Sequence, residues 1–127
     1  MTNNKESGDF GETVARAFLE GKGYQIVAQN YRFMRREIDI IARNGEYIVF
    51  IEVKTRTNTK FGTPAQSVSP GKQRHIISTA KGWLLNNMDR INLQARFDVI
   101  EIYRDIKKDK NYVRHIENAF MLTDKNR

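Results

Sequence analysis

Three acidic residues and one lysine have the types and spacing to support phosphoryl chemistry. They are Glu37, Asp39, Glu52 and Lys54, all within one short stretch of the chain. A divalent ion held by two or three carboxylates polarises a phosphoryl oxygen and activates a water molecule. A nearby lysine can orient that water and offset developing negative charge. Asp39, Glu52 and Lys54 are therefore the candidate catalytic residues.

The residues around this set predict a β-hairpin. Asn44-Gly45 is a strong signal for a type I′ turn, in which both residues take positive φ. That turn sets Glu37 directly opposite Glu52 and makes Asp39 a diagonal neighbour of Glu52. Alternation along the strands predicts an apolar face and a charged face. The apolar face carries Ile38, Ile40, Ala42, Tyr47, Val49, Ile51 and Val53, and the charged face carries Glu37, Asp39, Glu52 and Lys54.

The charged face of this hairpin has two readings. Carboxylates about 5 Å apart repel by about 3 kcal/mol at an effective dielectric constant near 20. A cation that the sequence does not supply would remove that repulsion, and hard divalent ions take oxygen ligands of this kind. A solvated face, on which water screens the charges, is the alternative. The hairpin geometry leaves both open.

Composition favours a single folded domain that binds a polyanion. The chain has 127 residues and a net charge of +7, with 22 Lys and Arg against 15 Asp and Glu. We expect one domain over residues 1–127, with loose ends at 1–7 and about 120–127. The surplus of positive charge favours nucleic acid as the partner. The absence of cysteine excludes disulfides and thiolate metal sites and fits a reducing cytoplasm. No apolar run reaches the length of a membrane span, so no membrane partner is expected.

The order of expected elements predicts an α/β fold. A long helix between strands permits a parallel crossover, so we expect a mixed β-sheet flanked by helices. Asp9 is the expected cap of the first helix, and Ser69-Pro70 opens the second. The expected elements are a helix over 9–20, strands over 24–33 and on both sides of the hairpin turn, a loop over 57–68, a helix from 70 to about 86, a strand over 96–103, a charged turn over 104–111 and a short strand over 112–117.

The motifs together resemble a known family. Asp39 followed by Glu52-Val53-Lys54 matches the PD-(D/E)XK nuclease signature. The wider pattern resembles the YraN-like family of small predicted endonucleases, which is similar to archaeal Holliday junction resolvases. It covers about residues 8–103. The family pattern is carried by Gly11-Glu12, Ala15, Leu19-Glu20, Gly23-Tyr24, Asn30-Tyr31-Arg32, residues 37–41 and 50–56, Phe61-Gly62, Pro64, Lys72, Ala80, Trp83-Leu84 and residues 96–99.

The resemblance implies a restriction-endonuclease-like fold and a set of roles. It implies that Glu12, Asp39 and Glu52 bind the metal, Mg²⁺ or Mn²⁺, and that Lys54 acts in catalysis. Glu12 has an alternative role, because Asp9 and Glu12 have the spacing of a capping box. This chain departs from the family at Arg36, where Gly is usual. The expected register puts Arg36 opposite Val53 on the apolar face, which calls for a snorkelling side chain or a bulge.

Basic residues near the acids are the candidate nucleic-acid contacts. Lys72 and Arg74 begin the second helix, where backbone N–H groups and cations could bind phosphate. As a group we expect phosphate contacts, although any single one can be ordinary surface. The candidate nucleic-acid-binding residues are Arg32, Arg35, Arg56, Lys72 and Arg74.

Several other polar and aromatic residues have a structural reading. We expect Asp98 to support the site or face solvent, and we expect Trp83 in the core. Tyr24, Tyr31 and Phe33 are expected to pack in the core or at an edge. His75 and His115 have no partner at metal-ligand spacing.

Two functions fit these observations. The first is a metal-dependent endonuclease that hydrolyses phosphodiester bonds in DNA, with branched or repair-related structures as candidate substrates. The second is a nucleic-acid-binding module that keeps the nuclease fold with little or no cleavage. The acid cluster favours the first, because a pure binder does not need repelling carboxylates. By analogy with resolvases that act on two-fold symmetric junctions, a homodimer is one expected assembly.

Overall fold

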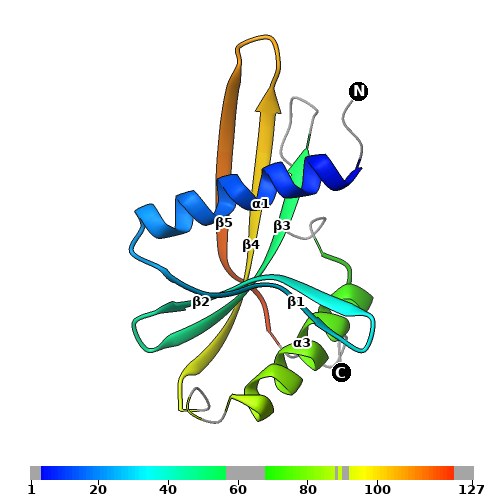
Figure 1. Ribbon diagram of the computed structural model, residues 1–127, viewed down its shortest axis with the longest axis vertical. Helices are drawn as coiled ribbons and strands as arrows, with labels where there is room; N and C mark the ends of the chain where they lie inside the picture. The colour runs from blue at the N-terminus through cyan, green and yellow to red at the C-terminus, as the bar shows by residue number, and fades with distance from the viewer. Residues whose placement is uncertain (1–3, 57–67, 88, 90–91, 122–127) are drawn as a thin grey trace.

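The computed structural model describes residues 4–56, 68–87, 89 and 92–121. Within them a five-stranded mixed sheet carries one helix on each face, which confirms the expected α/β class (Figure 1). Neither described helix combines the length and the apolar run that crossing a membrane requires. The elements are α1 (Asn4–Gly21), β1 (Gln25–Phe33), β2 (Arg36–Asn44), β3 (Tyr47–Arg56), α3 (Pro70–Asn86), β4 (Gln94–Asp105) and β5 (Lys110–Phe120).

The sheet has the strand order β1-β2-β3-β4-β5. β3 and β4 are parallel and the other neighbours are antiparallel. The chain from β3 to β4 includes α3, as the expected crossover requires. The expected loop over 57–68 lies outside the described residues except for Val68, which is buried.

Helix α1 begins earlier than the sequence predicts. Its first residue is Asn4, so Asp9 lies inside the helix and the predicted cap and capping box are wrong. The helix ends as expected, with hydrogen bonds from Gly23 N to Glu20 O and from Tyr24 N to Leu19 O. These contacts turn the chain into β1.

The β2–β3 turn lies one residue later than expected. Asn44 pairs with Tyr47, so Gly45 and Glu46 are the turn residues. Gly45 has φ of 60° and Glu46 is not among the positive-φ residues, which is typical of a type II′ turn. The pairing register is therefore shifted by two residues, and the predicted pairs are wrong. A shift of two residues keeps the alternation of side chains between the faces. The prediction is wrong for Ile38, however, because it packs on the α3 side of the sheet while Ile40 packs on the α1 side.

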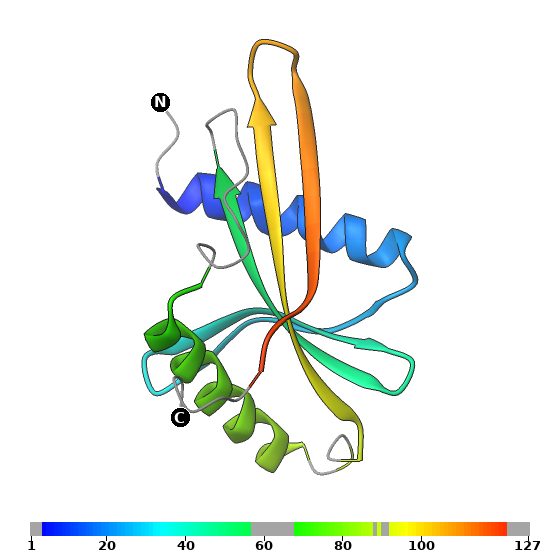
Figure 2. The same ribbon diagram turned by 180° about the vertical axis from the view of Figure 1, so that it is seen from behind.

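The hairpin near this turn is buried on both faces, so the predicted charged face is wrong there. Helix α1 covers one face of the sheet and α3 covers the other, so the hairpin lies between the two helices (Figure 2). The acids Glu37, Asp39 and Glu52 lie in the part of the hairpin distant from the turn. The α1 side buries Ala15, Leu19, Tyr24, Ile40, Ala42, Val49, Ile51, Ile100 and Ile102. The α3 side buries Ile38, Ile41, Ile48, Phe50, Val68, Ile76, Ile77, Ala80, Trp83, Val99 and Phe120.

Helix α3 begins as the sequence predicts. The Ser69 side chain accepts a hydrogen bond from Lys72 N at 3.2 Å, and Pro70 is the first helical residue. Trp83 is buried and its ring lies 5.9 Å from that of Phe50, which confirms its place in the core. Trp83 thereby holds α3 against the sheet.

The last two strands are longer than expected. β4 runs to Asp105 and β5 begins at Lys110, so the predicted charged turn over 104–111 is shortened to residues 106–109. The β4–β5 hairpin projects past α1 at one end of the molecule (Figure 1).

Candidate metal and nucleic-acid site

Asp39 lies at the centre of the acidic residues. The β2–β3 ladder ends at the pair Ile40 and Ile51, and Asp39 and Glu52 follow that pair on the two strands. Asp39 Oδ2 accepts a hydrogen bond from Val53 N at 2.8 Å, which holds β2 and β3 together beyond the ladder. Burial raises the pKa of Asp39, the Val53 hydrogen bond opposes that rise, and the charge of Glu37 adds to it.

Glu12 and Glu37 meet Asp39 from α1 and β2. One carboxylate oxygen from each of the three residues lies within 4.8 Å of the others. Gly11 makes this approach possible, since a Cβ atom there would lie 2.0 Å from Thr55 Oγ1 on β3. Burial, followed by the charge of Asp39, raises the pKa of Glu12, and a hydrogen bond from Asn30 opposes the rise.

Glu52 is the most deeply buried acid of this group, with 8% of its surface exposed. Burial, followed by the charge of Asp39, raises its pKa to about 7. The charges of Lys72 and Lys54 oppose that rise. A hydrogen bond with the Asp39 carboxyl adds to the rise, because Glu52 can donate it only when protonated. The pKa values of both neighbouring carboxyls are therefore raised, and neither is stabilised in its charged form by folding.

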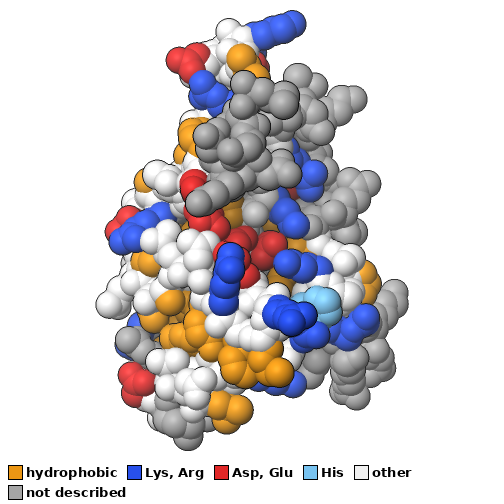
Figure 3. Space-filling view, turned by 45° about the vertical axis from the view of Figure 1, so that its right-hand side comes forward, with side chains coloured by type: hydrophobic (Ala, Val, Ile, Leu, Met, Phe, Trp, Pro, Cys, Tyr) orange, Lys and Arg blue, Asp and Glu red, His pale blue; other side chains and the backbone are white. Residues whose placement is uncertain are grey.

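Two lysines approach the Glu52 carboxylate from different elements. Lys54 Nζ on β3 lies 3.6 Å from Glu52 Oε1, and Lys72 Nζ on α3 lies 3.9 Å from the same atom. On one face of the molecule, acidic side chains gather and Lys and Arg side chains surround them (Figure 3). We call Glu12, Glu37, Asp39 and Glu52 the acid cluster.

The acid cluster offers the donor set that hard divalent cations prefer. Its ligand atoms are carboxylate oxygens, which suit Mg²⁺, Mn²⁺ and Ca²⁺. The pKa values of Glu12, Asp39 and Glu52 are all raised, so the two lysines do not balance the buried negative charge. An added cation would lower all three pKa values. The donor atoms and their electrostatics therefore both fit a bound metal ion.

The structure brings Glu12, Asp39, Glu52 and Lys54 close to one another and adds Glu37 to them. Asp39 contacts Glu52 and lies beside Glu12, while Lys54 is next to Glu52. Glu37 is not opposite Glu52 as predicted; its carboxylate joins Glu12 and Asp39, and it also pairs with Arg32 at 3.3 Å. With the turn at Gly45-Glu46, the sequence would have placed Asp39, and not Glu37, opposite Glu52. No local sequence signal places Glu37 beside Glu12, since α1 brings that residue from another part of the chain.

The predicted nucleic-acid contacts have different surroundings. Lys72 is beside Glu52, while Arg35 and Arg74 are exposed. Arg32 is exposed and pairs with Glu37. Arg56 donates a hydrogen bond to the fully buried Glu101 at 3.0 Å, so its side chain has a structural partner.

Arg36 is not opposite Val53 as the sequence predicts. It pairs with Phe33 in the β1–β2 hairpin and is exposed. Neither the snorkelling stem nor the bulge expected at that position is needed.

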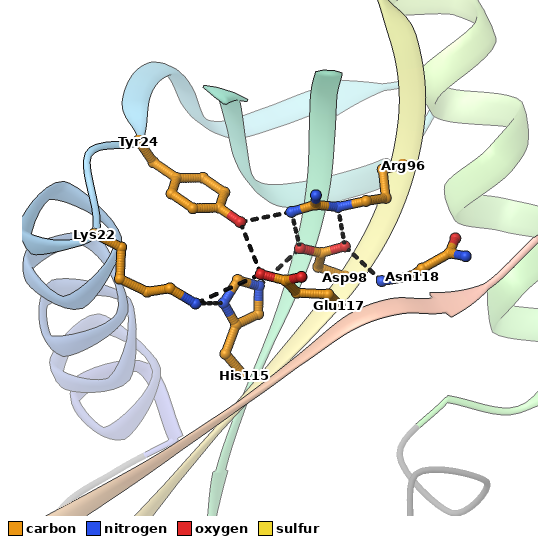
Figure 4. A network of polar contacts seen from close by, with 7 residues as sticks. All are labelled: Lys22, Tyr24, Arg96, Asp98, His115, Glu117 and Asn118. Atoms are coloured by element: carbon orange, nitrogen blue, oxygen red, sulfur yellow. Dashed lines mark hydrogen bonds and ion pairs between the residues drawn. The ribbon is translucent and has the colours of Figure 1, made fainter. Parts of the chain in front are cut away.

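Asp98 forms a second buried polar site, which the sequence did not predict (Figure 4). It is fully buried and does not face solvent. Arg96 donates two hydrogen bonds to it at 3.0 and 2.9 Å, and Asn118 N donates a third at 2.9 Å. His115 Nε2 lies 2.7 Å from Asp98 Oδ2. These bonds outweigh the effect of burial, which acts in the opposite direction, and lower the pKa of Asp98.

The surroundings of Asp98 fix the role of His115. Lys22 Nζ lies 2.8 Å from His115 Nδ1, and a lysine ammonium group can only donate. His115 Nδ1 therefore accepts from Lys22, and Nε2–H donates to Asp98. Arg96 also donates to Tyr24 Oη at 2.5 Å. We call Lys22, Tyr24, Arg96, Asp98, His115, Glu117 and Asn118 the Asp98 network.

Comparisons with known proteins place this chain among bacterial proteins of similar length. The family model described as "Uncharacterised protein family UPF0102" matches residues 11–102. A UPF0102 protein of Clostridioides difficile is 49% identical over 119 residues, covering 93% of this chain and 99% of that protein. A UPF0102 protein of Chlorobaculum tepidum is 47% identical over 121 residues, covering 91% of this chain and 92% of that protein.

Similarity to solved structures is more distant. Pyrococcus furiosus SfsA in complex with Ca²⁺ matches with a TM-score of 0.38 and 10% identity, covering 85% of this chain and 60% of that chain. A likeness at this level carries no argument about the site.

Proposed function

This chain belongs to the UPF0102 family, and we propose that it is a metal-dependent endonuclease that hydrolyses phosphodiester bonds in DNA. The observation that carries the proposal is the acid cluster, in which three buried or partly buried carboxylates have raised pKa values beside two lysines. A protein that only binds a polyanion has no use for buried, mutually repelling acids.

Glu12, Asp39 and Glu52 would hold Mg²⁺ or Mn²⁺. The ligand oxygens that lie within 4.8 Å of one another are those of Glu12, Glu37 and Asp39, so Glu37 is a further candidate ligand, and Glu52 joins them through its contact with Asp39. When bound, such an ion lowers the pKa of a coordinated water and polarises a phosphoryl oxygen. Asp39 is oriented for this role because Val53 N fixes one of its carboxylate oxygens.

Lys54 would orient the attacking water and offset developing negative charge at the phosphate. Its position depends on Glu52, whose carboxylate lies 3.6 Å away. Lys72 would compensate charge from the other side of Glu52 and contact the phosphate at the N-terminus of α3, whose first turn contains no acidic residue. Both lysines thus attract the substrate toward the acids.

The test is a cleavage assay on linear, flapped and four-way-junction DNA with Mg²⁺ or Mn²⁺. The wild type is expected to cut at least one form, and Asp39→Asn is expected not to. Lys54→Ala is expected to lower the rate by at least about 100-fold. Lys81→Ala is the matched control, because Lys81 is an exposed lysine of α3.

The outcomes separate the two functions. If the wild type binds these DNA forms and cuts none of them with either ion, the protein is a binding module with a nuclease fold. If Lys54→Ala cuts as fast as Lys81→Ala, the role given to Lys54 is wrong.

A further inference from the structure

The turn between β1 and β2 has an unusual sequence for its conformation. Phe33 pairs with Arg36, so Met34 and Arg35 are the two turn residues. Their φ values are 50° and 68°, and a turn with two positive φ values is of type I′. Asn and Gly are the residues that adopt this conformation most easily. Met and Arg adopt it only with strain. Backbone strain of this kind is typical of functional sites, so the side chains of Met34 and Arg35 are candidates for a function.

Packing explains the neighbouring phenylalanine. A Cβ atom on Gly82 of α3 would lie 3.3 Å from the Phe33 ring, so the ring rests closely on the helix at Gly82. This contact anchors the hairpin to α3. Phe33 therefore has a structural role even though 38% of its surface is exposed.

Packing does not explain Met34. Its surface is 78% exposed, the largest value among the exposed large hydrophobic residues of the described chain. It borders a hollow of about 160 Å³ together with Phe33, Arg36, Ser78 and Thr79. An apolar side chain is thus held out in water on a turn that is anchored to the body of the protein.

The charges around Met34 suit a nucleic-acid backbone. Arg32, Arg35 and Arg36 surround it in sequence, and all three are exposed. The first acidic residue after the turn is Glu37, a member of the acid cluster. The strand β2 begins at Arg36, directly after the turn, so Asp39 lies about 10 Å along the strand from Arg36 at about 3.3 Å per residue. A duplex whose phosphate lies at the acid cluster would therefore reach this turn within a few base pairs.

We propose that the Met34 side chain is a wedge that enters a base step of the bound DNA, while Arg32, Arg35 and Arg36 hold the adjacent phosphates. The inference rests on the proposed function and names its substrate class, which is duplex DNA with an opened base step at a flap, a mismatch or a branch. Apolar wedges, methionine among them, partly unstack the step that they enter. Unstacking costs least where pairing is already interrupted. Met34 thus favours interrupted over fully paired duplex.

The test measures binding without cleavage. Wild type, Met34→Asn and Met34→Leu are titrated in EDTA with a fully paired duplex and with the same duplex carrying a flap. Met34→Asn is expected to weaken flap binding by about tenfold and to change duplex binding little. Met34→Leu keeps an apolar wedge and is expected to bind as the wild type does. Ile106→Asn is the matched control, because Ile106 is an exposed apolar residue at the β4–β5 turn.

Two further measurements distinguish a wedge from a structural role. Asn accepts positive φ more easily than Met, so Met34→Asn is expected to raise the melting temperature while it weakens flap binding. A 2-aminopurine beside the flap is expected to brighten when the wild type binds, and not when Met34→Asn binds at saturation. Arg35→Gln is expected to lower the slope of log K against log salt concentration by about 1, whereas Met34→Asn leaves that slope unchanged.

The results separate this inference from the proposed function. Equal flap binding by Met34→Asn and Ile106→Asn overturns the wedge, and so does a wild type that does not distinguish flap from duplex. Neither result bears on cleavage, which has its own assay. If the wild type binds no DNA at all, both the wedge and the proposed function are wrong.

Discussion

Glu52 of the acid cluster and Asp98 of the Asp98 network lie on the neighbouring strands β3 and β4, and their surroundings shift the pKa of a buried carboxyl in opposite directions. Ile51 of β3 is in register with Asp98 of β4, and Glu52 is the next residue along β3. Successive side chains alternate, so Asp98 lies on the α1 side of the sheet and Glu52 on the other. Asp98 has hydrogen bonds from a bidentate arginine, a backbone N–H and His115, and its pKa is lowered. Glu52 has two lysines at longer range, and its pKa is raised to about 7.

The contrast shows how to recognise a carboxylate that stabilises the fold and one that does not. Every acceptor position that burial took from water at Asp98 has a protein donor in its place, so ionisation is favoured in the folded state. At the acid cluster the carboxylates are buried against one another, so folding opposes their ionisation. We interpret the first as structural and the second as a cation site.

The largest effect that separates the two regions is expected from Asp98→Asn. The substitution leaves the mostly buried Arg96 without its carboxylate, and breaking a buried ion pair on one side costs about 3–5 kcal/mol of unfolding free energy. Asp109→Asn is the matched control, because Asp109 is exposed and has positive φ, which Asn accepts. Urea unfolding measures both. Equal stability of the two variants would contradict the structural role of Asp98.

The opposite sign is expected for Glu52→Gln in chelator. The folded-state pKa of Glu52 is about 7 against an ordinary value of 4.5, so the folded protein binds more protons than the unfolded chain between these values. The stabilising contribution is complete below pH 4.5 and is lost as pH rises through about 7. Glu52→Gln is therefore expected to stabilise metal-free protein above pH 7, by no more than about 3 kcal/mol.

Thermal unfolding at several pH values tests the behaviour of Glu52. The gain from Glu52→Gln is expected to shrink as pH falls toward 4.5. The reverse trend is expected for Asp98. Its pKa is lowered in the folded protein, so its contribution to stability is lost only at acid pH. If Glu52→Gln lowers the melting temperature in chelator at neutral pH, the Glu52 ion pairs with Lys54 and Lys72 stabilise the fold and the comparison fails.

A smaller effect is expected for Glu12→Gln. Glu12 is only partly buried, so the metal-free protein is expected to change in stability by less than about 0.5 kcal/mol. Its affinity for Mn²⁺ is expected to fall because a carboxylate oxygen of the cluster is lost. Glu20→Gln on the same helix is the control, since Glu20 is exposed and pairs with Arg16. Titration calorimetry that gives both variants equal Mn²⁺ affinity would remove Glu12 from the site.

Local signals in the sequence predicted most of the fold. The Ser69-Pro70 start of α3, the glycines after α1 and the alternation of β2 and β3 each act within a few residues, so they could be read from the chain. The turn register could not be read as reliably, because Asn44-Gly45 and Gly45-Glu46 both allow a two-residue turn and packing decides between them. The error moved the predicted neighbour of Glu52 from Asp39 to Glu37.

The candidate site was predicted in part for the same reason. Residue types identified Asp39, Glu52 and Lys54, and the family resemblance supplied Glu12. The approach of Glu37 to Glu12 and of Lys72 to Glu52 depends on how α1 and α3 pack on the sheet. The Asp98 network draws its residues from the turn between α1 and β1 and from β4 and β5, so no local sequence pattern predicts it.

The most direct test of the account is calorimetric titration of Mn²⁺ into wild type, Asp39→Asn and Asp109→Asn. The titration is run at neutral pH in buffers of different ionisation enthalpy. Wild type and Asp109→Asn are expected to bind Mn²⁺ with release of protons, because the metal displaces protons held by carboxyls of raised pKa. Asp39→Asn is expected to bind at least about tenfold more weakly. Unchanged affinity in Asp39→Asn, or binding without proton release, would contradict a cation site at the acid cluster.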